Sequence, residues 1–353
     1  MSRMSWADFM NLPCAHGGPA GSARLRSMPE DFVVREWLGF GADGDGDHLL
    51  LKIRKRGANT MWVAKQLARM GKIPPRDVGF AGLKDRDAVA EQSFTVPARS
   101  AVPNWLGVTG EGFEVIGAER IRRKLKRGAL KGNDFELVLR DFVGDAAVLE
   151  QRLQKLAAAG VPNYFGPQRF GRDGNNIATA IAWFEGGPAP ERMERGFALS
   201  AARSVIFNAV LAERVNDGTW NHLRDGDVVN LNGSGSIFLA ESIDDTLRER
   251  CDRLDVHPTG PMWHGDALPS TGAVAEMELQ IAQRHATLAE GLSKAKLEPE
   301  RRPLRVPVRE LRWRIDGADV HLQFRLQRGS FATAVLHELI SNAFQADTPE
   351  ADV

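Results

Sequence analysis

Hydrophobic and polar residues alternate in short runs over the first part of the chain, and alternation with a period of two predicts β-strands. The clearest runs cover 31–37 and 48–55, with a turn rich in Gly and Asp between them. Further strands are expected near 78–81, 93–96, 113–116 and 135–139. Helical spacing replaces the alternation over about 60–70, where Asn59 offers an N-cap.

The middle of the chain is mostly helical by the same criterion, and the strand pattern returns near the end. A helix over 146–159 is expected to end at Gly160, which Pro162 follows. Helices are also expected near 176–184, 200–216, 272–285 and 330–344, strands near 228–231, 236–239, 308–315 and 320–326, and loops over 163–172 and 257–265. This order fits an α+β chain with a central insertion better than alternating βαβ units.

Length and composition are those of a globular protein with two domains or one large insertion. The chain has 353 residues, of which 43% are hydrophobic and 26% charged. Its two cysteines, Cys14 and Cys251, lie far apart, which supports neither a disulfide framework nor a zinc site and is typical of a reducing cytoplasm. The N-terminus lacks the apolar core of a signal peptide, and no apolar run is long enough to span a bilayer. We therefore expect a cytoplasmic protein.

The net charge is zero, which argues mildly against a general nucleic-acid binder, but positive residues gather in two places. The first basic cluster lies within 52–56 and the second, denser one within 120–131. Either cluster alone would be read as a solvated face. Together they flank the segment around Asp85, and we expect them to form a track for a polyanion.

The segment 79–94 contains the clearest chemical group of the chain, the carboxylate of Asp85. Two cations, Lys84 and Arg86, flank it, and apolar residues lie on either side. Nearby positive charge favours the ionised form of an aspartate. An ionised carboxylate can act as a nucleophile without a base to activate it.

This segment resembles the nucleophile motif of the TruD family of pseudouridine synthases, which convert a uridine of tRNA, at position 13, to pseudouridine. The attacking aspartate of the family corresponds to Asp85, and the resemblance runs through nearly the whole chain. It implies an α+β fold with a mixed or antiparallel pseudouridine-synthase sheet built from both ends of the chain, 1–161 and 306–353. The TruD-specific α+β domain would be inserted between them, over 162–305.

Other matching segments imply the residues that bind the substrate. Phe32, within 29–36, corresponds to a phenylalanine that contacts the extruded base, and Arg26 would hold a phosphate nearby. Asn133 and Phe135 lie two residues apart, on the same side of an expected strand. The Asn133 amide suits the edge of uracil, and Phe135 stands where other pseudouridine synthases carry a tyrosine, which leaves the proton acceptor unassigned.

The last matching segment, 327–339, contains Phe331 at the position of a substrate-binding residue of the family. This sequence departs from the family at Gln327 or Arg328, where proline is frequent, and at His337, where arginine is frequent. The resemblance also makes Lys84 and Arg86 neighbours of the substrate, either of which would keep Asp85 ionised.

The segment 163–172 interleaves aromatic residues with arginines and contains Tyr164, the only tyrosine of the chain. Such a pattern suits RNA loops, because bases stack on rings and cations hold phosphates. A packed linker between domains would have the same composition, and both interpretations stay open.

Signals for metals and cofactors are weak. The run from Asp43 to Asp47 imitates a calcium loop but has His48 and Arg54 where glycine and glutamate belong. His257 and His264 have no third ligand close in sequence. We therefore expect no metal and no small-molecule cofactor.

The sequence thus predicts a tRNA pseudouridine synthase that acts on tRNA as a monomer, without membrane attachment. Asp85 would attack C1′ or C6, and the sequence leaves both routes open. Two alternatives remain. The first is a glycoside- or nucleoside-cleaving hydrolase that pairs Asp85 with Asp87 or Glu91. The second is an RNA-binding module without catalysis.

Overall fold

The structure is a computed structural model that describes residues 9–84 and 88–343. Contacts divide the chain into two compact units, which we describe separately. Unit 1 combines Met1–Ser22, Val143–Val308 and Ser330–Val353, and unit 2 combines Ala23–Phe142 and Arg309–Gly329. The expected domain limits at 162 and 305 differ from these divisions and stay a prediction.

Unit 2 is built on one mixed sheet. Its strands are β2 (Phe32–Trp37), β3 (His48–Lys55), β4 (Gly79–Phe80), β5 (Val89–Pro97), β6 (Thr109–Gly110), β7 (Phe113–Ile121), β8 (Gly132–Gly144), β15 (Arg309–Asp316) and β16 (Asp319–Gln327). Among the described residues the order is β15-β16-β8-β2-β5-β3-β7-β6, with β4 paired to β5. Only β2 and β5 of this path run parallel, as read from the described strands. The late strands join the early sheet where β16 pairs with β8, as the sequence predicted.

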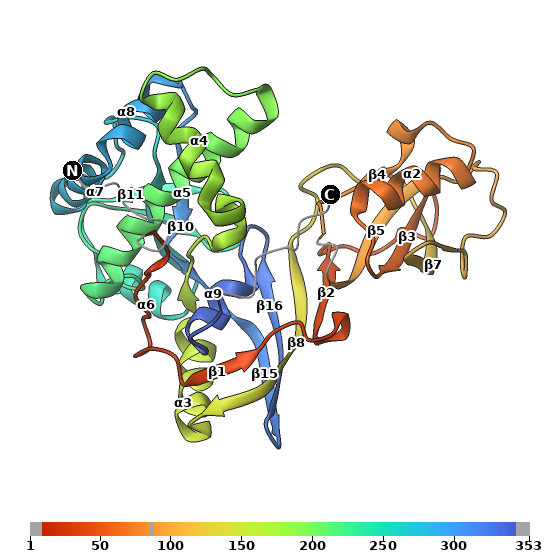
Figure 1. Cartoon of the computed structure of the whole chain (residues 1–353), viewed down its shortest axis with the longest axis horizontal. Helices are drawn as coiled ribbons and strands as arrows, with labels where there is room; N and C mark the ends of the chain where they lie inside the picture. Colours follow the sequence, from red (N-terminus) through yellow and green to blue (C-terminus); the bar gives the residue numbers. More distant parts are fainter. Residues whose placement is uncertain (1–8, 85–87, 344–353) are drawn as a thin grey trace. The chain divides into compact units, whose positions relative to one another are not determined.

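The two faces of this sheet differ because side chains alternate along each strand. The helix face carries Leu51, Ile53 and Phe94, which pack in one core with residues of α2 (Thr60–Met70). Figure 1 shows α2 beside β3, β4 and β5. The other face, here called the charged face, carries Arg35 and Glu91.

Unit 2 is completed by short pieces. The 3₁₀ turns η1 (Pro29–Asp31) and η2 (Pro75–Asp77) precede β2 and β4, and β1 (Gly21–Arg24) lies where the chain passes from unit 1 to unit 2. Asn59 caps α2 as expected, because its side chain accepts from the Trp62 backbone N at 2.8 Å.

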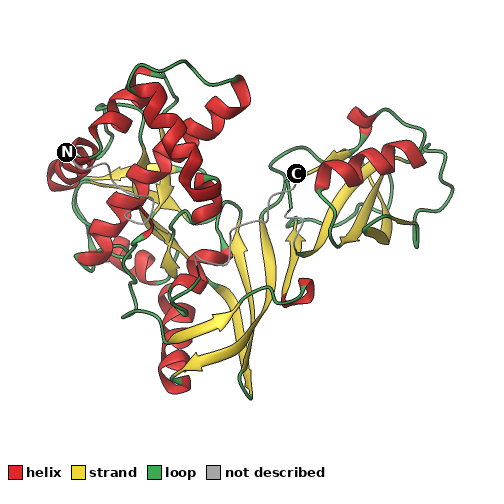
Figure 2. Cartoon of the chain, viewed as in Figure 1, coloured by secondary structure: helices red, strands yellow, loops and turns green. Residues whose placement is uncertain are grey.

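Unit 1 holds most of the helices (Figure 2). They are α3 (Ala146–Ala159), α4 (Asn175–Phe184), α5 (Arg192–Asn216), α6 (Asp245–Asp252), α7 (Gly272–Arg284), α8 (Ala286–Lys294) and α9 (Ala332–His337), with 3₁₀ turns η3 (Pro167–Phe170) and η4 (Arg172–Gly174). A sheet of order β11-β10-β12-β13 joins them, built from β10 (Asp227–Leu231), β11 (Ile237–Ala240), β12 (Val256–Met262) and β13 (Glu300–Pro303). A separate pair joins β9 (Val161–Pro162) to β14 (Arg305–Val306).

The central helix of unit 1 is α5. By length and composition alone it could cross a membrane, the one described helix to pass that test, although the sequence analysis expected no such segment. However, 56% of its apolar window is buried inside the protein. Its buried residues Phe207 and Leu211 pack with Trp263 in the core of unit 1. A core helix has the same composition, so this finding is weak support for a membrane span.

Most of the predicted elements are confirmed, with different ends. The helix α3 covers the predicted 146–159, whereas α5 begins eight residues before the expected 200, at Arg192. The helix predicted over 330–344 is shorter, because α9 ends at His337. The expected loop over 257–265 was wrong, since β12 occupies much of it, and α6, α8 and β13 were not predicted.

Candidate active site

The expected nucleophile Asp85, with Arg86 and Asp87, lies outside the described residues, but the chain that leads to it is described. Lys84 is held at three atoms. Its ammonium lies 2.9 Å from the Glu36 carboxylate, with the two side chains 9% and 1% exposed. Its backbone N donates to Thr60 Oγ1 at 2.9 Å, and its carbonyl accepts from Lys55 Nζ at 3.4 Å. The residue before Asp85 is therefore fixed on the helix face.

Hydrogen bonds between buried polar side chains hold the same segment in place. Thr60 Oγ1 donates to Gln92 Oε1 at 2.9 Å, and Gln92 Nε2 donates to the Gly82 carbonyl at 2.8 Å. Gln92 lies on β5 and is fully buried. Because these bonds join α2, β5 and the segment after β4, they fix where the chain enters the candidate site.

Asn133 lies beside the ion pair between Glu36 and Lys84. It is directly opposite Glu36 in the pairing of β8 with β2, so both side chains point to the helix face. Its Oδ1 is buried and has no hydrogen-bond partner among the described residues. Buried side-chain oxygens usually have a partner, so this atom is available to a ligand donor.

Phe32 and Phe135 form an apolar wall on the same face. Their ring centroids lie 6.2 Å apart in an edge-on arrangement, and Phe135 stacks on Phe324 at 5.3 Å. The Arg26 guanidinium covers the Phe32 ring at 4.3 Å, and only 8% of Phe32 is exposed. The structure thus brings Arg26, Phe32, Phe135 and Asn133 together in unit 2, and their role in substrate binding stays a prediction.

Phe331 belongs to unit 1 and is described within it. It stands at the N-terminal end of α9, and its ring lies 5.9 Å from that of Phe165. Phe165, like Tyr164 and Phe170, is at most 2% exposed and belongs to the core of unit 1. For the aromatic residues of 163–172 the packed interpretation is therefore confirmed.

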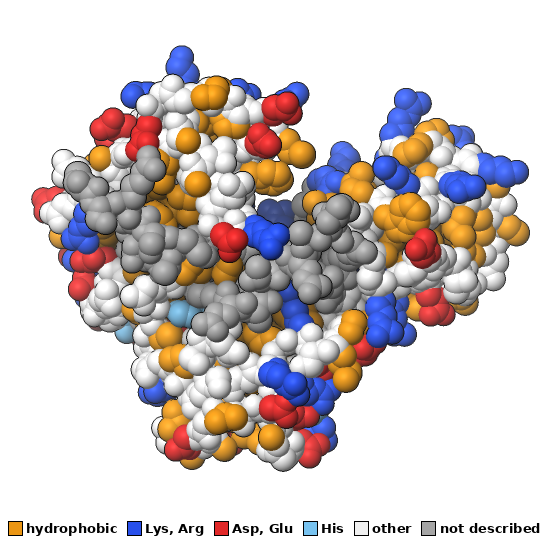
Figure 3. Space-filling model, in the orientation of Figure 1, with side chains coloured by type: hydrophobic (Ala, Val, Ile, Leu, Met, Phe, Trp, Pro, Cys, Tyr) orange, Lys and Arg blue, Asp and Glu red, His pale blue; other side chains and the backbone are white. Residues whose placement is uncertain are grey.

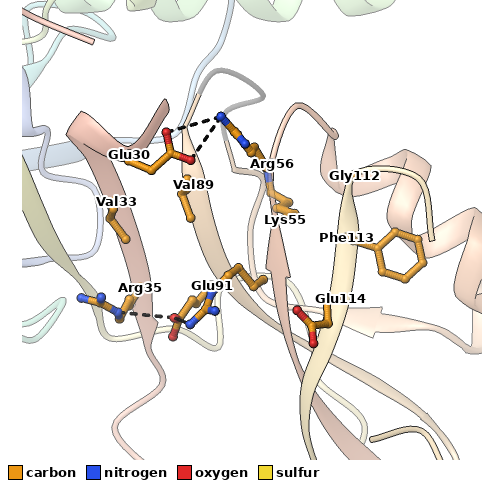
Figure 4. Close-up of a pocket in the computed structure, with 11 residues that line it drawn as sticks. Glu30, Val33, Arg35, Lys55, Arg56, Val89, Glu91, Gly112, Phe113 and Glu114 are labelled. Carbon is orange, nitrogen blue, oxygen red and sulfur yellow. Dashed lines mark hydrogen bonds and ion pairs between the residues drawn. The ribbon is translucent and has the colours of Figure 1, made fainter. Parts of the chain in front are cut away.

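The charged face of unit 2 has a pocket of about 440 Å³, and several of its charges are already paired with one another (Figure 4). Glu91, which is 5% exposed, lies 3.5 Å from Arg35, 2.9 Å from Lys52 and 3.0 Å from Arg54. Burial alone would raise the pKa of Glu91, but hydrogen bonds from Lys52 and Arg54 and the charge of Arg35 lower it overall. Glu91 is therefore a poor proton donor for the hydrolase alternative.

The same contacts change the interpretation of the two basic clusters. In the first cluster Lys55 is fully buried, Lys52 and Arg54 are paired with Glu91, and Arg56 lies 3.2 Å from Glu30. Its place in a polyanion track stays a prediction. Part of the second cluster is also engaged. Arg122 Nε donates to Asp45 Oδ1 at 2.8 Å, so this carboxylate of the run that imitates a calcium loop bonds an arginine. The Arg127 guanidinium covers the Phe80 ring at 4.0 Å. Figure 3 shows Lys and Arg side chains gathered over the part of unit 2 that carries α2.

The residues that hold the segment before Asp85 in place were not predicted from the sequence. Glu36, Thr60 and Gln92 are separated in sequence but are joined through Lys84 and Gly82. The sequence did contain a signal for Glu36. It lies two and four residues after Val34 and Phe32 on one strand, so the three side chains point to the same face of the sheet. Nothing in the sequence pointed to Thr60 or Gln92.

The chain is similar to known proteins over nearly its whole length. The sequence model of the family tRNA pseudouridine synthase D (TruD) matches residues 14–181 and 189–339. The chain is 44% identical to the tRNA pseudouridine synthase D of Nitrosococcus oceani over 92% of this chain and 93% of that one. It is 45% identical to the protein of the same name from Xanthomonas campestris, over 94% and 95% of the two chains.

A solved structure has the same fold. A Methanosarcina mazei protein described as a tRNA pseudouridine synthase D superposes with a TM-score of 0.74 over 95% of this chain and 97% of that one, at 21% identity. The α+β fold with a mixed sheet is therefore that of a pseudouridine synthase. Within this class, the chain belongs to the TruD family, tRNA pseudouridine synthase D.

Proposed function

We propose that this protein isomerises a uridine of tRNA, at position 13, to pseudouridine, with Asp85 as the nucleophile. The observation that carries the proposal is the match to the TruD family over nearly the whole chain, including the segment that holds Asp85. The arrangement of Asn133, Phe32 and Phe135 on the face to which Lys84 is fixed supports it further.

The reaction moves one bond and one proton. The C1′–N1 bond breaks, the uracil turns while it is held, and C1′ joins C5. The proton on C5 is then lost and N1 gains one, so atoms and electrons balance without an oxidant or reductant. The Asp85 carboxylate attacks C1′ or C6 and leaves when the new bond is complete.

The residues of this chain hold the base while it turns. Asn133 bonds the uracil edge through its unpartnered Oδ1, and Phe32 and Phe135 replace the stacking that an extruded base loses. Because the Lys84 ammonium is paired with Glu36, Lys84 acts by fixing the chain that leads to Asp85, and Arg86 is the candidate to keep Asp85 ionised. Arg26 would hold a phosphate, and Phe331 would contact the substrate from unit 1.

The partner that this function requires is tRNA. We further propose that the protein works as a monomer in the cytoplasm, without a metal, a small-molecule cofactor or a membrane. Among residues 9–84 and 88–343, no three His, Cys, Asp or Glu side chains are grouped as a metal site needs.

The first prediction tests the nucleophile. Asp85→Asn removes the charge but keeps the shape, so it should abolish tritium release from tRNA labelled at uridine C5 while tRNA still binds. Asp87→Asn is the matched control, two residues away, and should keep most of the activity. Tritium release by the Asp85→Asn protein at the wild-type rate would end the assignment. Free uracil in the product of the wild type would favour the hydrolase instead.

A further inference from the structure

Unit 1 contains three guanidinium groups that surround a single carboxylate. Arg169 lies on η3, Arg203 on α5 and Arg302 on β13. Glu300 Oε2 lies 3.4 Å from Arg203 Nη1, and the negative charge of Glu300 raises the pKa of all three arginines against the lowering effect of burial. The cluster therefore carries three positive charges against one negative charge, and Glu300 is 63% exposed.

The guanidinium of Arg169 lies over aromatic rings. Its guanidinium lies 4.6 Å from the centre of the Phe165 ring and 6.0 Å from that of Phe331. Its Nε is buried, and among the described residues this N–H has no acceptor. Stacking on rings orients a guanidinium but uses none of its in-plane donors.

Arg302 stacks on the same ring, 4.1 Å from the centre of Phe165. Its Nη2 donates to Asn163 Oδ1 at 2.5 Å, which fixes its plane. Burial, and then the neighbouring positive charge of Arg169, lower the pKa of Arg302 to about 9. Two guanidinium groups thus lie near one ring and repel each other, an arrangement that an anion would relieve.

Arg203 and His264 present further unused nitrogen atoms. Arg203 Nη2 donates to the Met262 carbonyl at 2.6 Å, but its buried Nε has no partner within the described part of the chain. The buried Nδ1 of His264, two residues after Met262, also has none. Burial, and then the charges of Arg203 and Arg301, lower the pKa of His264, so the ring stays neutral.

These observations share one explanation. Buried N–H donors without acceptors cost free energy, and so do crowded positive charges. A ligand with several acceptor oxygens and a negative charge would remove both costs. Arginine forks match the oxygens of a phosphate, which can accept from more than one guanidinium at once.

We propose that Arg169, Arg203 and Arg302 form a phosphate-binding subsite that holds a backbone phosphodiester of the RNA substrate. This inference rests on the proposed function, because it takes tRNA as the ligand. Phe165 and Phe331 orient the two stacked arginines, and Asn163 fixes Arg302. The aromatic residues of 163–172 thus serve RNA binding indirectly, by positioning cations rather than by stacking on bases.

The second prediction tests this subsite through the salt dependence of tRNA binding. Arg169→Gln removes the charge at a side chain whose buried Nε has no acceptor among the described residues. We expect tRNA affinity to fall about tenfold, as for one lost charge-assisted contact. The slope of log K against log salt should decrease by about one, because one phosphate contact is lost. Arg253→Gln, at an exposed arginine 3.3 Å from Glu249, is the matched control and should change neither quantity.

A second variant should change tRNA affinity in the opposite direction. Glu300→Gln removes the competing carboxylate and should tighten tRNA binding at low salt. Inorganic phosphate at millimolar concentration should compete with tRNA for the wild type more than for Arg169→Gln. An unchanged slope in Arg169→Gln, whether or not its melting temperature falls, would overturn the subsite. If the wild type forms pseudouridine while the slope stays unchanged, the subsite fails and the proposed function stands.

Discussion

At the scale of single residues, two asparagines, Asn133 and Asn163, differ in what their amide groups bond. Asn163 uses its amide fully, since Nδ2 donates to the Pro303 carbonyl at 2.8 Å and Oδ1 accepts from Arg302. Asn133 has a buried Oδ1 that none of the described residues bonds. The two amides are therefore distinguished by their contacts, which the sequence alone does not reveal.

The third prediction follows from this difference. Asn133→Ala should lower the rate of pseudouridine formation at least tenfold, because one hydrogen bond to the base is lost, while the free energy of unfolding changes by less than about 1 kcal/mol. Asn163→Ala is the matched control and should destabilise the protein by about 1–3 kcal/mol, because it leaves buried groups unpaired. Both quantities come from turnover assays and urea unfolding. A strongly destabilised Asn133→Ala protein would mean that this amide has a structural role.

At the scale of elements, strands and helices with clear periodicity could be predicted from the sequence, and irregular ones could not. The strand β12 carries Pro258 and Pro261, which normally argue against an internal strand. It tolerates them because β10 pairs with its first half and β13 with its second half. Each half is thus an edge on one side, which depends on tertiary pairing that no local pattern encodes.

The same limit applies to the candidate site. Asn133 and Phe135 could be placed on one face because strand alternation is regular, whereas Phe32 lies on another strand and was singled out by the family resemblance. The contacts of Lys84 with Glu36 and Thr60 could not be predicted, because they join elements far apart in the chain.

The fourth prediction concerns the ion pair that ties β2 to the segment after β4. Glu36→Gln leaves the Lys84 ammonium buried without its counter-charge, so we expect the free energy of unfolding to fall by about 3–5 kcal/mol. Adding Lys84→Met should restore much of that stability, since no charge is then buried alone. Activity should be low in both variants, because the segment before Asp85 loses the ion pair between Lys84 and Glu36. Urea unfolding and turnover assays measure the two effects, and wild-type stability in Glu36→Gln would contradict the argument.

At the scale of the whole molecule, segments near the two ends of the chain meet within unit 1. His337 Nε2 lies 3.0 Å from the Leu12 carbonyl and 3.6 Å from Cys14 Sγ. The buried Glu338 carboxylate accepts from the backbone N of Ala15 at 2.8 Å and of His16 at 3.0 Å. From the sequence, His337 was notable only as a departure from the family, and its contacts with Leu12 and Cys14 join residues more than 300 positions apart.

The fifth prediction is that this junction makes the stability of the protein depend on pH. Burial lowers the pKa of His337 from 6.5 to about 4, so the unfolded chain binds its proton first as the pH falls. The contribution of neutral His337 is therefore complete above pH 6.5 and is lost as the pH falls through about 4. From the size of this shift it amounts to about 3 kcal/mol.

His337→Gln isolates this contribution, because glutamine can still donate to Leu12 but does not titrate. Between neutral pH and about pH 4, the wild type should lose about 3 kcal/mol more free energy of unfolding than the variant. Burial raises the pKa of Glu338, and burial lowers that of His16, but both groups are present in the two proteins and cancel in the difference. Urea unfolding at several pH values gives the comparison. Parallel pH profiles for the two proteins would show that His337 has the same pKa in the folded and the unfolded state, and would contradict the effect of burial.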